Sequence, residues 1–507
     1  MGFFEDHMLR LYPSLFHIPI TLAILVVSVS LYRLYFHPLA HIPGPPFACV
    51  SSLFLYAICY LGVEGRVLLY YHEKYCVSVL RIAPDAVSLS GDDTLHQVYV
   101  AGGGLPKDAR YQNFRVEGHD TIFSALDQDY RNERAKAVLP LFAPSRIQNA
   151  YDSDEVTASL VRKFIARLQE ERASPNSKVD ILDLSSRLSI DFLTAYLFHQ
   201  PYGGLDEPTQ HQTSSPKAPS PPLKWANKLS ATPFVLSIVS FSRFSLLPNW
   251  AFNAIFSSLV ARVLSNDEVS TSMRTVSRYA DAVLGADENG QGGRSRETYQ
   301  SRLLAAGITR EETLVQCKAV MFAGADSTAV MLATILFHLV RRPEARARLR
   351  AEIAENETAG GDPQALPYLR AVVREGLRLG MANPARLTRI FLPPGTKVGA
   401  AAYVFHHNRS VFPQPFAFQP ERWLPSPEDS PSDVEARRVR EQTAFPFGLG
   451  SRACLGRNLA SFQLHVAVKE VVASGVLEGS RTCADRIELI EWFNAEIKGH
   501  ELEIQWN

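Results

Sequence analysis

The stretch AVMFAGADSTAVMLATILFHLV, from Ala319 to Val340, is apolar on nearly every face of the helix that its pattern predicts. A helix without a polar face cannot lie at a surface, so this one must be buried inside a folded protein. The chain has enough apolar residues to cover it, since 46% of its 507 residues are hydrophobic and 21% are charged. We therefore expect a large folded body with this helix in its core.

Most of the remaining chain also has helical periodicity. From about Leu126 onward, segments such as EVTASLVRKFIARLQEE and DILDLSSRLSIDFLTAYLF repeat their apolar residues at the helical period. Before that point, VSVLRIAPDAVSLSG alternates apolar and polar residues and predicts a β-hairpin that turns at Pro84 and Asp85. The expected fold class is mainly α with a small β region.

The N-terminus carries an apolar run, LFHIPITLAILVVSVSLY, from Leu15 to Tyr32. It contains no Asp, Glu, Lys or Arg and is close to the length that crosses a bilayer. We interpret it as an uncleaved transmembrane anchor, with a cleaved signal peptide as the alternative. Glu5 and Asp6 precede the run, whereas Arg33 and His37 follow it, and this asymmetry predicts that the body faces the cytosol.

The anchor suggests a division of the chain into a short tail (1–14), a transmembrane anchor (15–36), a proline-rich hinge (37–47) and one large domain (48–507). The hinge sequence HPLAHIPGPP cannot continue a helix and favours a stiff extended connector. The apolar stretch that follows, FACVSSLFLYAICYLG, is too short for a confident second span and suits either the membrane interface or the core.

Charge and cysteine content exclude several classes of protein. Lys+Arg and Asp+Glu both number 52, so no net charge favours nucleic acid as a partner. The six cysteines include no CxxC pair, which argues against a zinc site and against a disulfide scaffold. Free thiols in a reducing compartment fit this distribution better.

One cysteine stands in a glycine-rich loop, FPFGLGSRACLGRNLA, just before an apolar helix pattern. Its spaced positions are Phe447, Gly450, Arg452, Cys454 and Gly456. A thiolate ligates metals strongly, and N–H groups at a helix N-terminus stabilise its charge. A loop cysteine by itself is more often an incidental thiol, but these five positions together arise by chance in roughly one chain in ten thousand.

The loop resembles the haem-ligand loop of the cytochrome P-450 family, and the chain is identified as a member of that family. Its motifs follow the family's order: HPLAHIPGPP, AGADST, EGLR, FQPERW and FGLGSRACLG. The resemblance implies the cytochrome P-450 fold and haem b with Cys454 as the axial thiolate ligand of the iron, held in a loop that includes Phe447 and Gly450. YRLYFHPLAHIPGPP is similar to fungal microsomal members that oxidise secondary metabolites, which implies anchoring in the endoplasmic reticulum.

Gly324, Asp326, Ser327 and Thr328 interrupt the apolar helix at one place. Taken alone, they indicate a kinked core helix whose polar groups are satisfied internally. The resemblance implies instead that they open a groove for dioxygen, with Asp326 passing protons inward to the alcohol of Ser327, next to Thr328. Serine lacks the methyl group that restricts threonine, so its hydroxyl is less fixed.

Glu375 and Arg378 stand three residues apart in LPYLRAVVREGLRL and can touch on one helix face. Taken alone, they indicate a solvated ion pair. The resemblance implies that Arg422, in the later segment Pro420–Trp423, joins them in a structural triad that locks the core around the haem.

The resemblance also implies arginines that bind the haem propionates, because arginine offers paired donors to a carboxylate. The candidates are Arg452, Arg389 and Arg134. In the family, a His or Trp commonly stands four residues before the last of these arginines, and Tyr130 takes that position here. A register shifted by one residue, which the following PLF suggests, puts Ala135 in the place of the arginine. The family also has a further strand-turn between RLTRI and PPGTKV; here the short join is a tolerated shortening or a defect in the chain.

The resemblance implies a monooxygenase that inserts one oxygen atom from O2 into an apolar small molecule, such as a terpenoid or polyketide. Electrons would come from NADPH through NADPH–cytochrome P-450 reductase, and the catalytic domain would face the cytosol. One alternative is a family member that rearranges or dehydrates its substrate without net oxygen insertion. Another is a non-catalytic haem-binding protein, which AGADST argues against.

Overall fold

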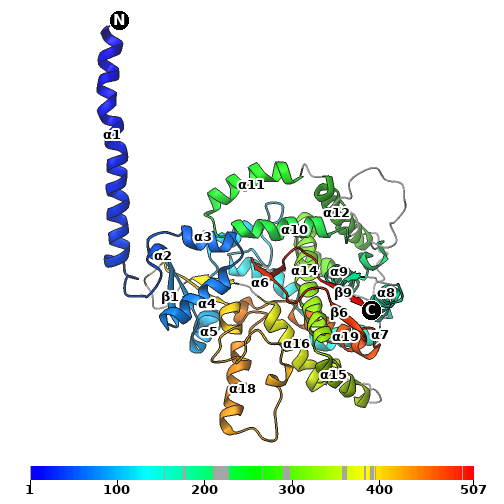
Figure 1. Cartoon of the computed structure of the whole chain (residues 1–507). Coiled ribbons are helices and arrows are strands. Elements are labelled where there is room, and N and C mark those ends of the chain that lie inside the picture. Colours follow the sequence, from blue (N-terminus) through cyan, green and yellow to red (C-terminus); the bar gives the residue numbers. More distant parts are fainter. Residues whose placement is uncertain are drawn as a thin grey trace.

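The computed structural model describes residues 2–153, 155–174, 178–208, 228–264, 267–288, 297–356, 362–381, 384–388, 393, 395–493 and 495–506. One long helix, α1 (Gly2–Leu31), extends away from all other elements, which gather into a single body (Figure 1). It runs without interruption through the expected tail into the apolar run and is followed by a short π-helix, Tyr32–Phe36.

The body is mainly helical, as expected. After α1, its α-helices are α2 (Pro46–Val50), α3 (Leu53–Tyr60), α4 (Glu64–Tyr75), α5 (Asp92–Tyr99), α6 (Gln128–Val138), α7 (Pro144–Ser153), α8 (Glu155–Ala173), α9 (Ile181–Phe198), α10 (Thr232–Phe241), α11 (Asn249–Leu264), α12 (Asp267–Glu288), α13 (Tyr299–Ala305), α14 (Arg310–Arg341), α15 (Pro343–Asn356), α16 (Pro367–Gly380), α17 (Ala402–His406), α18 (Pro431–Thr443) and α19 (Arg457–Ala473). Short 3-10 helices that matter below are η3 (Ala109–Phe114), η9 (Pro420–Trp423) and η10 (Gly450–Arg452).

The strands form small sheets. The largest has the order β1-β2-β5-β4, built from β1 (Val79–Ala83), β2 (Ala86–Leu89), β5 (Lys397–Ala401) and β4 (Pro384–Thr388). The others are β3-β9-β6, with β3 (Lys178–Asp180), β9 (Glu503–Trp506) and β6 (Ser480–Thr482), and β7-β8, with β7 (Leu489–Glu491) and β8 (Ala495–Ile497). The predicted hairpin is confirmed, since β1 and β2 are antiparallel and Ala83 pairs with Ala86 across the expected turn.

The short join noted in the sequence lies between two strands that pair with each other. β4 and β5 are antiparallel, and Thr388 stands opposite Lys397 at the end next to the join. The four-stranded sheet therefore contains both β4 and β5 despite the short join between them. Arg389, a predicted propionate ligand in this join, lies outside the described residues.

Helix α14 contains the apolar stretch from which the fold was inferred. It packs against α9, α16 and α19 in the middle of the body (Figure 1), and most of its side chains from Ala325 to Val340 are buried. Two glycines permit this packing: a Cβ on Gly324 would stand 2.0 Å from Leu193 of α9, and one on Gly376 of α16 would stand 2.2 Å from Ile335. Gly324 thus serves helix packing.

The apolar stretch after the hinge is divided between core and surface. In α3, Leu55, Ile58 and Cys59 are buried against the four-stranded sheet, whereas Leu53 and Leu61 are exposed. Part of this stretch therefore lies in the core, one of the two locations expected from the sequence, while Leu53 and Leu61 at the ends of α3 are exposed.

Candidate active site

The cysteine loop has a conformation that depends on its glycines. Gly448 and Gly450 have φ values of 70° and 66°, in the left-handed region that favours glycine. Gly450 also packs so closely against the chain near α5 that a Cβ would lie 1.7 Å from the carbonyl oxygen of Tyr99. The loop is therefore held against a distant segment by main-chain contact.

Cys454 lies just before helix α19, as expected. Its own N–H donates to the carbonyl of Phe447 at 2.8 Å. Burial raises the pKa of its thiol, while the main-chain N–H groups of Gly456 and Arg457 bond to the sulfur and oppose that rise. The loop thus fixes the sulfur and directs donors toward it.

Cys454 is exposed although surrounding protein atoms desolvate its thiol, so open space, which we call the hollow, lies beside this residue. Ala323, in the middle of the otherwise buried helix α14, is exposed as well. A Cβ on Gly456 would meet only Phe142, at 3.9 Å, so the protein itself leaves the space beside this glycine open. The accessible thiol can ligate a metal, and the open space beside Gly456 leaves room for a flat cofactor bound on the sulfur.

The polar residues of α14 separate onto two faces. Ser327 is half-buried and donates to the carbonyl of Ala323 at 2.8 Å, so it lies on the same side as that exposed residue. Asp326 and Thr328 are buried. Helix α14 continues unbroken through this segment. Of the two alcohols, the structure brings Ser327 to the open side and buries Thr328.

Glu375, Arg378 and Arg422 come together in a buried cluster. Arg378 donates to both carboxylate oxygens of Glu375, at 2.8 and 3.0 Å, and Arg422 donates to one of them at 3.1 Å. Arg378 also bonds to the carbonyls of His406 and Pro415, at 2.8 and 2.6 Å. The cluster joins α16 to η9 and to the segment before the cysteine loop.

One donor to Glu375 could not have been inferred from the triad pattern. The indole N–H of Trp423 donates to the Glu375 carboxylate at 3.0 Å. The signal was present as the residue that follows Arg422, but only the folded turn of η9 directs its ring inward. The carboxylate therefore receives donors from three side chains.

Arg452 and Arg134, the predicted propionate ligands among the described residues, have different partners. Arg452 donates to the carbonyl of Ala125 at 3.3 Å. Arg134 instead bonds to the carboxylates of Glu133 and Glu312, the latter on α14. Its pKa is raised by these bonds, chiefly by that to Glu312. The structure thus pairs Arg134 with acidic groups of the protein.

Two cations that sequence reasoning missed lie beside Arg452. Lys107 donates from Nζ to the carbonyl of Phe123, two residues from the carbonyl that Arg452 binds. Arg131 stands on the first turn of α6, and its charge acts on both Lys107 and Arg452. No spacing links residue 107 to residue 452, so the sequence held no signal for Lys107, whereas the register shifted by one residue put Arg131 in the family's aromatic position.

Four aromatic rings cluster beside Lys107. Phe493, from the turn between β7 and β8, lies 4.6 Å from Phe114 and 5.1 Å from Phe123, and Tyr111 lies 5.6 Å from Phe123, between ring centroids. The Lys107 ammonium lies 4.4 Å from the Tyr111 ring centroid and 4.6 Å from that of Phe123. This aromatic cluster is an apolar surface next to the cationic group.

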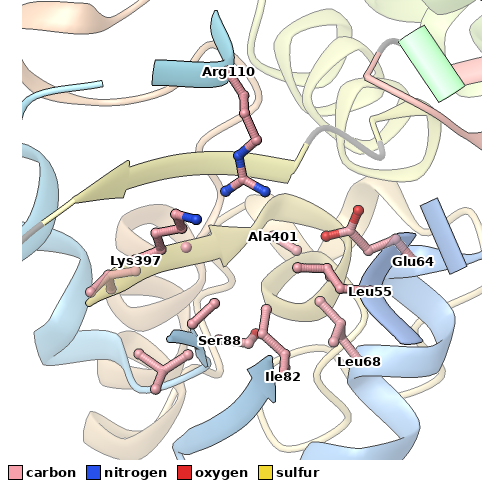
Figure 2. Close-up of a pocket in the computed structure, with 12 residues that line it drawn as sticks. Leu55, Glu64, Leu68, Ile82, Ser88, Arg110, Lys397 and Ala401 are labelled. Carbon is pink, nitrogen blue, oxygen red and sulfur yellow. The ribbon is translucent and has the colours of Figure 1, made fainter. Parts of the chain in front are cut away.

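A separate small cavity lies at the four-stranded sheet (Figure 2). It has a volume of about 20 Å³, and Figure 2 shows Arg110 and Glu64 reaching toward it from different elements. That volume holds about one water molecule and no organic substrate. Neither Cys454 nor any other predicted site residue lines this cavity.

Comparison with known proteins agrees with this arrangement. The sequence profile of the cytochrome P-450 family matches residues 43–474. Cytochrome P-450 monooxygenase mfmF of Annulohypoxylon moriforme is 48% identical, over 97% of this chain and 99% of the relative. Tryptophan 6-hydroxylase fscE of Fusarium equiseti is 26% identical, over 92% of this chain and 91% of its own.

A solved structure supports the fold independently. A crystal structure of a cytochrome P-450 superposes with a TM-score of 0.63 at 17% identity, over 87% of this chain and 94% of that chain. The shared fold, the cysteine loop and the extent of the sequence match together decide the assignment. The chain belongs to the cytochrome P-450 family and is a monooxygenase of that family.

Proposed function

We propose that this monooxygenase inserts one oxygen atom from O2 into an apolar secondary metabolite, such as a terpenoid or polyketide, using electrons from NADPH through a separate cytochrome P-450 reductase. The observation that carries the proposal is Cys454, a thiol fixed by its loop that is desolvated by the protein and still accessible. When bound on this thiolate, haem b supplies the activation of dioxygen and the transfer of its oxygen atom.

The protein's contribution is to hold the ligand and to move protons. The donors of Gly456 and Arg457 hold the Cys454 sulfur in place and moderate its charge. Ser327, on the open side of α14, offers a hydroxyl toward the hollow, and Asp326 is the buried acid next to it. We assign proton delivery to this pair, with Ser327 as the hydroxyl on the open side of α14 and Thr328 as a packing residue.

The apolar character of the substrate follows from the aromatic cluster. Phe114, Phe123 and Phe493 present ring surface from two distant parts of the chain. Such rings favour a flat or alicyclic hydrocarbon frame over a charged molecule. Two relatives carry names that state hydroxylation, tryptophan 6-hydroxylase and trichothecene C-4 hydroxylase of Trichoderma arundinaceum, which favours oxygen insertion over rearrangement here too.

Membrane attachment is the second part of the proposal. Within the described residues, two helices are long and apolar enough to cross a membrane: the segment His17–Phe36, none of which is buried, and α14, which is largely buried. The first is the anchor. On the body, Leu53 and Leu61 beside α3 and Trp250 of α11 are exposed, and α11 lies on the side toward which α1 extends (Figure 1). This side would face the endoplasmic reticulum membrane, with the catalytic domain in the cytosol.

The test is product analysis with isotopically labelled dioxygen. The full chain is expressed in membranes with an NADPH–cytochrome P-450 reductase and is supplied with fungal terpenoid and polyketide extracts. A product that carries one labelled oxygen atom and forms only with NADPH supports the proposal. An unlabelled product that forms without NADPH identifies a rearrangement enzyme, and haem binding without NADPH consumption identifies a non-catalytic protein.

A further inference from the structure

Three cationic side chains from separate parts of the chain meet beside the cysteine loop. Lys107 and Arg452 both donate to carbonyls of one short segment, at Phe123 and Ala125. Arg131 follows that segment on α6, where its guanidinium bonds only weakly to the neighbouring Asn132, at 3.2 Å. We call Lys107, Arg131 and Arg452 the cationic cluster.

The cationic cluster lacks a balancing anion within the described part of the chain. Neighbouring arginines are paired: Arg110 with Asp108 at 2.7 Å, Arg115 with Asp120 at 2.9 Å, and Arg134 with Glu312. Among the described residues, no carboxylate forms an ion pair with any member of the cationic cluster. The carboxylates of Asp108, Asp120 and Glu312 are thus engaged by other arginines.

This arrangement is unfavourable for the protein alone. Burial, with the charges of Arg452 and Arg131, lowers the pKa of Lys107 to about 7. Like charges that are brought together out of water repel one another. A bound anion lowers this electrostatic cost. The Lys107 ammonium itself lies over the rings of Tyr111 and Phe123, and these contacts hold it in place.

We propose that Lys107 and Arg131, together with Arg452, bind the two propionate carboxylates of haem b, and that Arg134 is not required for this. The inference rests on the proposed haem cofactor. Arg452 lies two residues before Cys454, so the cationic cluster is beside the ligand loop. Haem b carries two carboxylates, which match a group of cations that form no ion pair with a carboxylate of the described residues.

The shifted register considered for DYRNERAKAVLPLF agrees with this proposal. In that register the family's aromatic place falls on Arg131, and Ala135 takes the place of the arginine. Arg134 is then free to pair with Glu312 and to fasten α6 to α14. Lys107 supplies the cation that Ala135 cannot.

The experiment compares haem b with its dimethyl ester, in which both propionates are uncharged. The full-length protein is loaded with either cofactor, and transfer to an excess of apomyoglobin measures the rate of release. Lys107→Met and Arg131→Gln should each release haem b roughly tenfold faster than wild type, as expected for the loss of one charged hydrogen bond. The ester should leave wild type and both variants at the same rate.

Arg134→Gln is the matched control, since it removes an arginine one turn further along the same helix. It should lower the unfolding midpoint because Glu312 loses its partner, yet keep the wild-type ratio of acid to ester release. Lys107→Arg and Arg131→Lys should restore slow release. Resonance Raman bands of the propionate groups, recorded on the holoproteins, should shift in Lys107→Met and Arg131→Gln and stay unchanged in Arg134→Gln.

The proposal is overturned if Lys107→Met and Arg131→Gln release haem b as slowly as wild type, or if they lose the ester as fast as the acid. It is also overturned if Arg134→Gln alone shows the charge-dependent release. Failure of the proposed function would look different, because wild type would then show no thiolate-ligated haem spectrum with either cofactor.

Discussion

Two groups of charges in this protein differ in their balance: one is buried and pairs arginines with a carboxylate, and the other is half-buried and consists only of cations. Around Glu375, two arginines, a tryptophan and a main-chain N–H all donate to one carboxylate, and Arg378 and Glu375 are fully inaccessible to solvent. Around Lys107, three cations share no carboxylate of the described residues. The first group is satisfied within the protein and serves the fold. The second group lacks a carboxylate, and its positive charge is the basis for our proposal that the haem propionates bind there.

The difference extends to how each group should respond to mutation. Removing a member of the group around Glu375 leaves a buried charge without its partner, so the free energy of unfolding falls. Removing a member of the cationic cluster relieves repulsion between like charges in the protein without haem. It should weaken only the binding of haem. The following predictions test this contrast, from the largest expected effect to the smallest.

Glu375→Ala should have the largest effect. It leaves Arg378 and Arg422 buried without a carboxylate, which costs about 3–5 kcal/mol, a large share of a protein's free energy of unfolding. We expect little folded protein, measured by urea unfolding followed by circular dichroism. A Glu375→Ala protein as stable as wild type would show that the triad is not needed for the fold.

The same carboxylate gives a dependence on pH. Burial alone would raise the pKa of Glu375, but the bonds and charges of Arg378 and Arg422 lower it below its ordinary 4.5. A lowered pKa contributes stability that is present above about pH 4.5 and is lost as the pH falls through the folded value. Glu375→Gln should therefore show a flatter loss of stability in acid than wild type, and an equal slope would contradict this.

Cys454→Ala should remove the chemistry and keep the fold. Cys454 is exposed beside the hollow, so loss of its sulfur removes little packing. The reduced, carbon monoxide-bound wild type should show the red-shifted Soret band of thiolate ligation, and the variant should lack it entirely while its circular dichroism stays near wild type. Retention of that band in Cys454→Ala would assign the ligand to another residue.

Removing residues 1–36 should separate attachment from catalysis. Both groups of charges and the cysteine loop lie after this segment, and α1 contacts the body only at its C-terminal end (Figure 1). We expect much of the truncated protein to leave the membrane fraction, with an unchanged thiolate spectrum. Loss of haem on truncation would show that the anchor supports the body.

Ser327→Ala should have the smallest effect, a partial loss of coupling. Haem binding should remain, while a larger share of NADPH consumption ends as hydrogen peroxide, because the hydroxyl beside Ala323 is lost. Thr328→Val is the matched control: Thr328 is buried, so it should stay coupled. Uncoupling by Thr328→Val alone would move the proton-delivering role to the neighbouring residue.

Much of the candidate site could be read from local spacing. The cysteine loop, the pair Glu375 and Arg378, and the polar break in α14 each lie within one short stretch, where spacing along the chain determines which side chains share a face. The burial of α14 followed from its lack of a polar face. These inferences needed no knowledge of how distant segments meet.

The tertiary structure decided which arginine is paired and which is left unpaired. Arg131 and Arg134 stand on one helix, and only the position of Glu312 on α14 separates their roles. It also brought Lys107 to Arg452 and Phe493 to Phe114, and it showed that Gly324 makes room for Leu193. The sequence alone determined the chemistry of each motif, because covalent spacing sets local geometry. The charge balance around the site depends on contacts between segments hundreds of residues apart, which only the folded chain brings together.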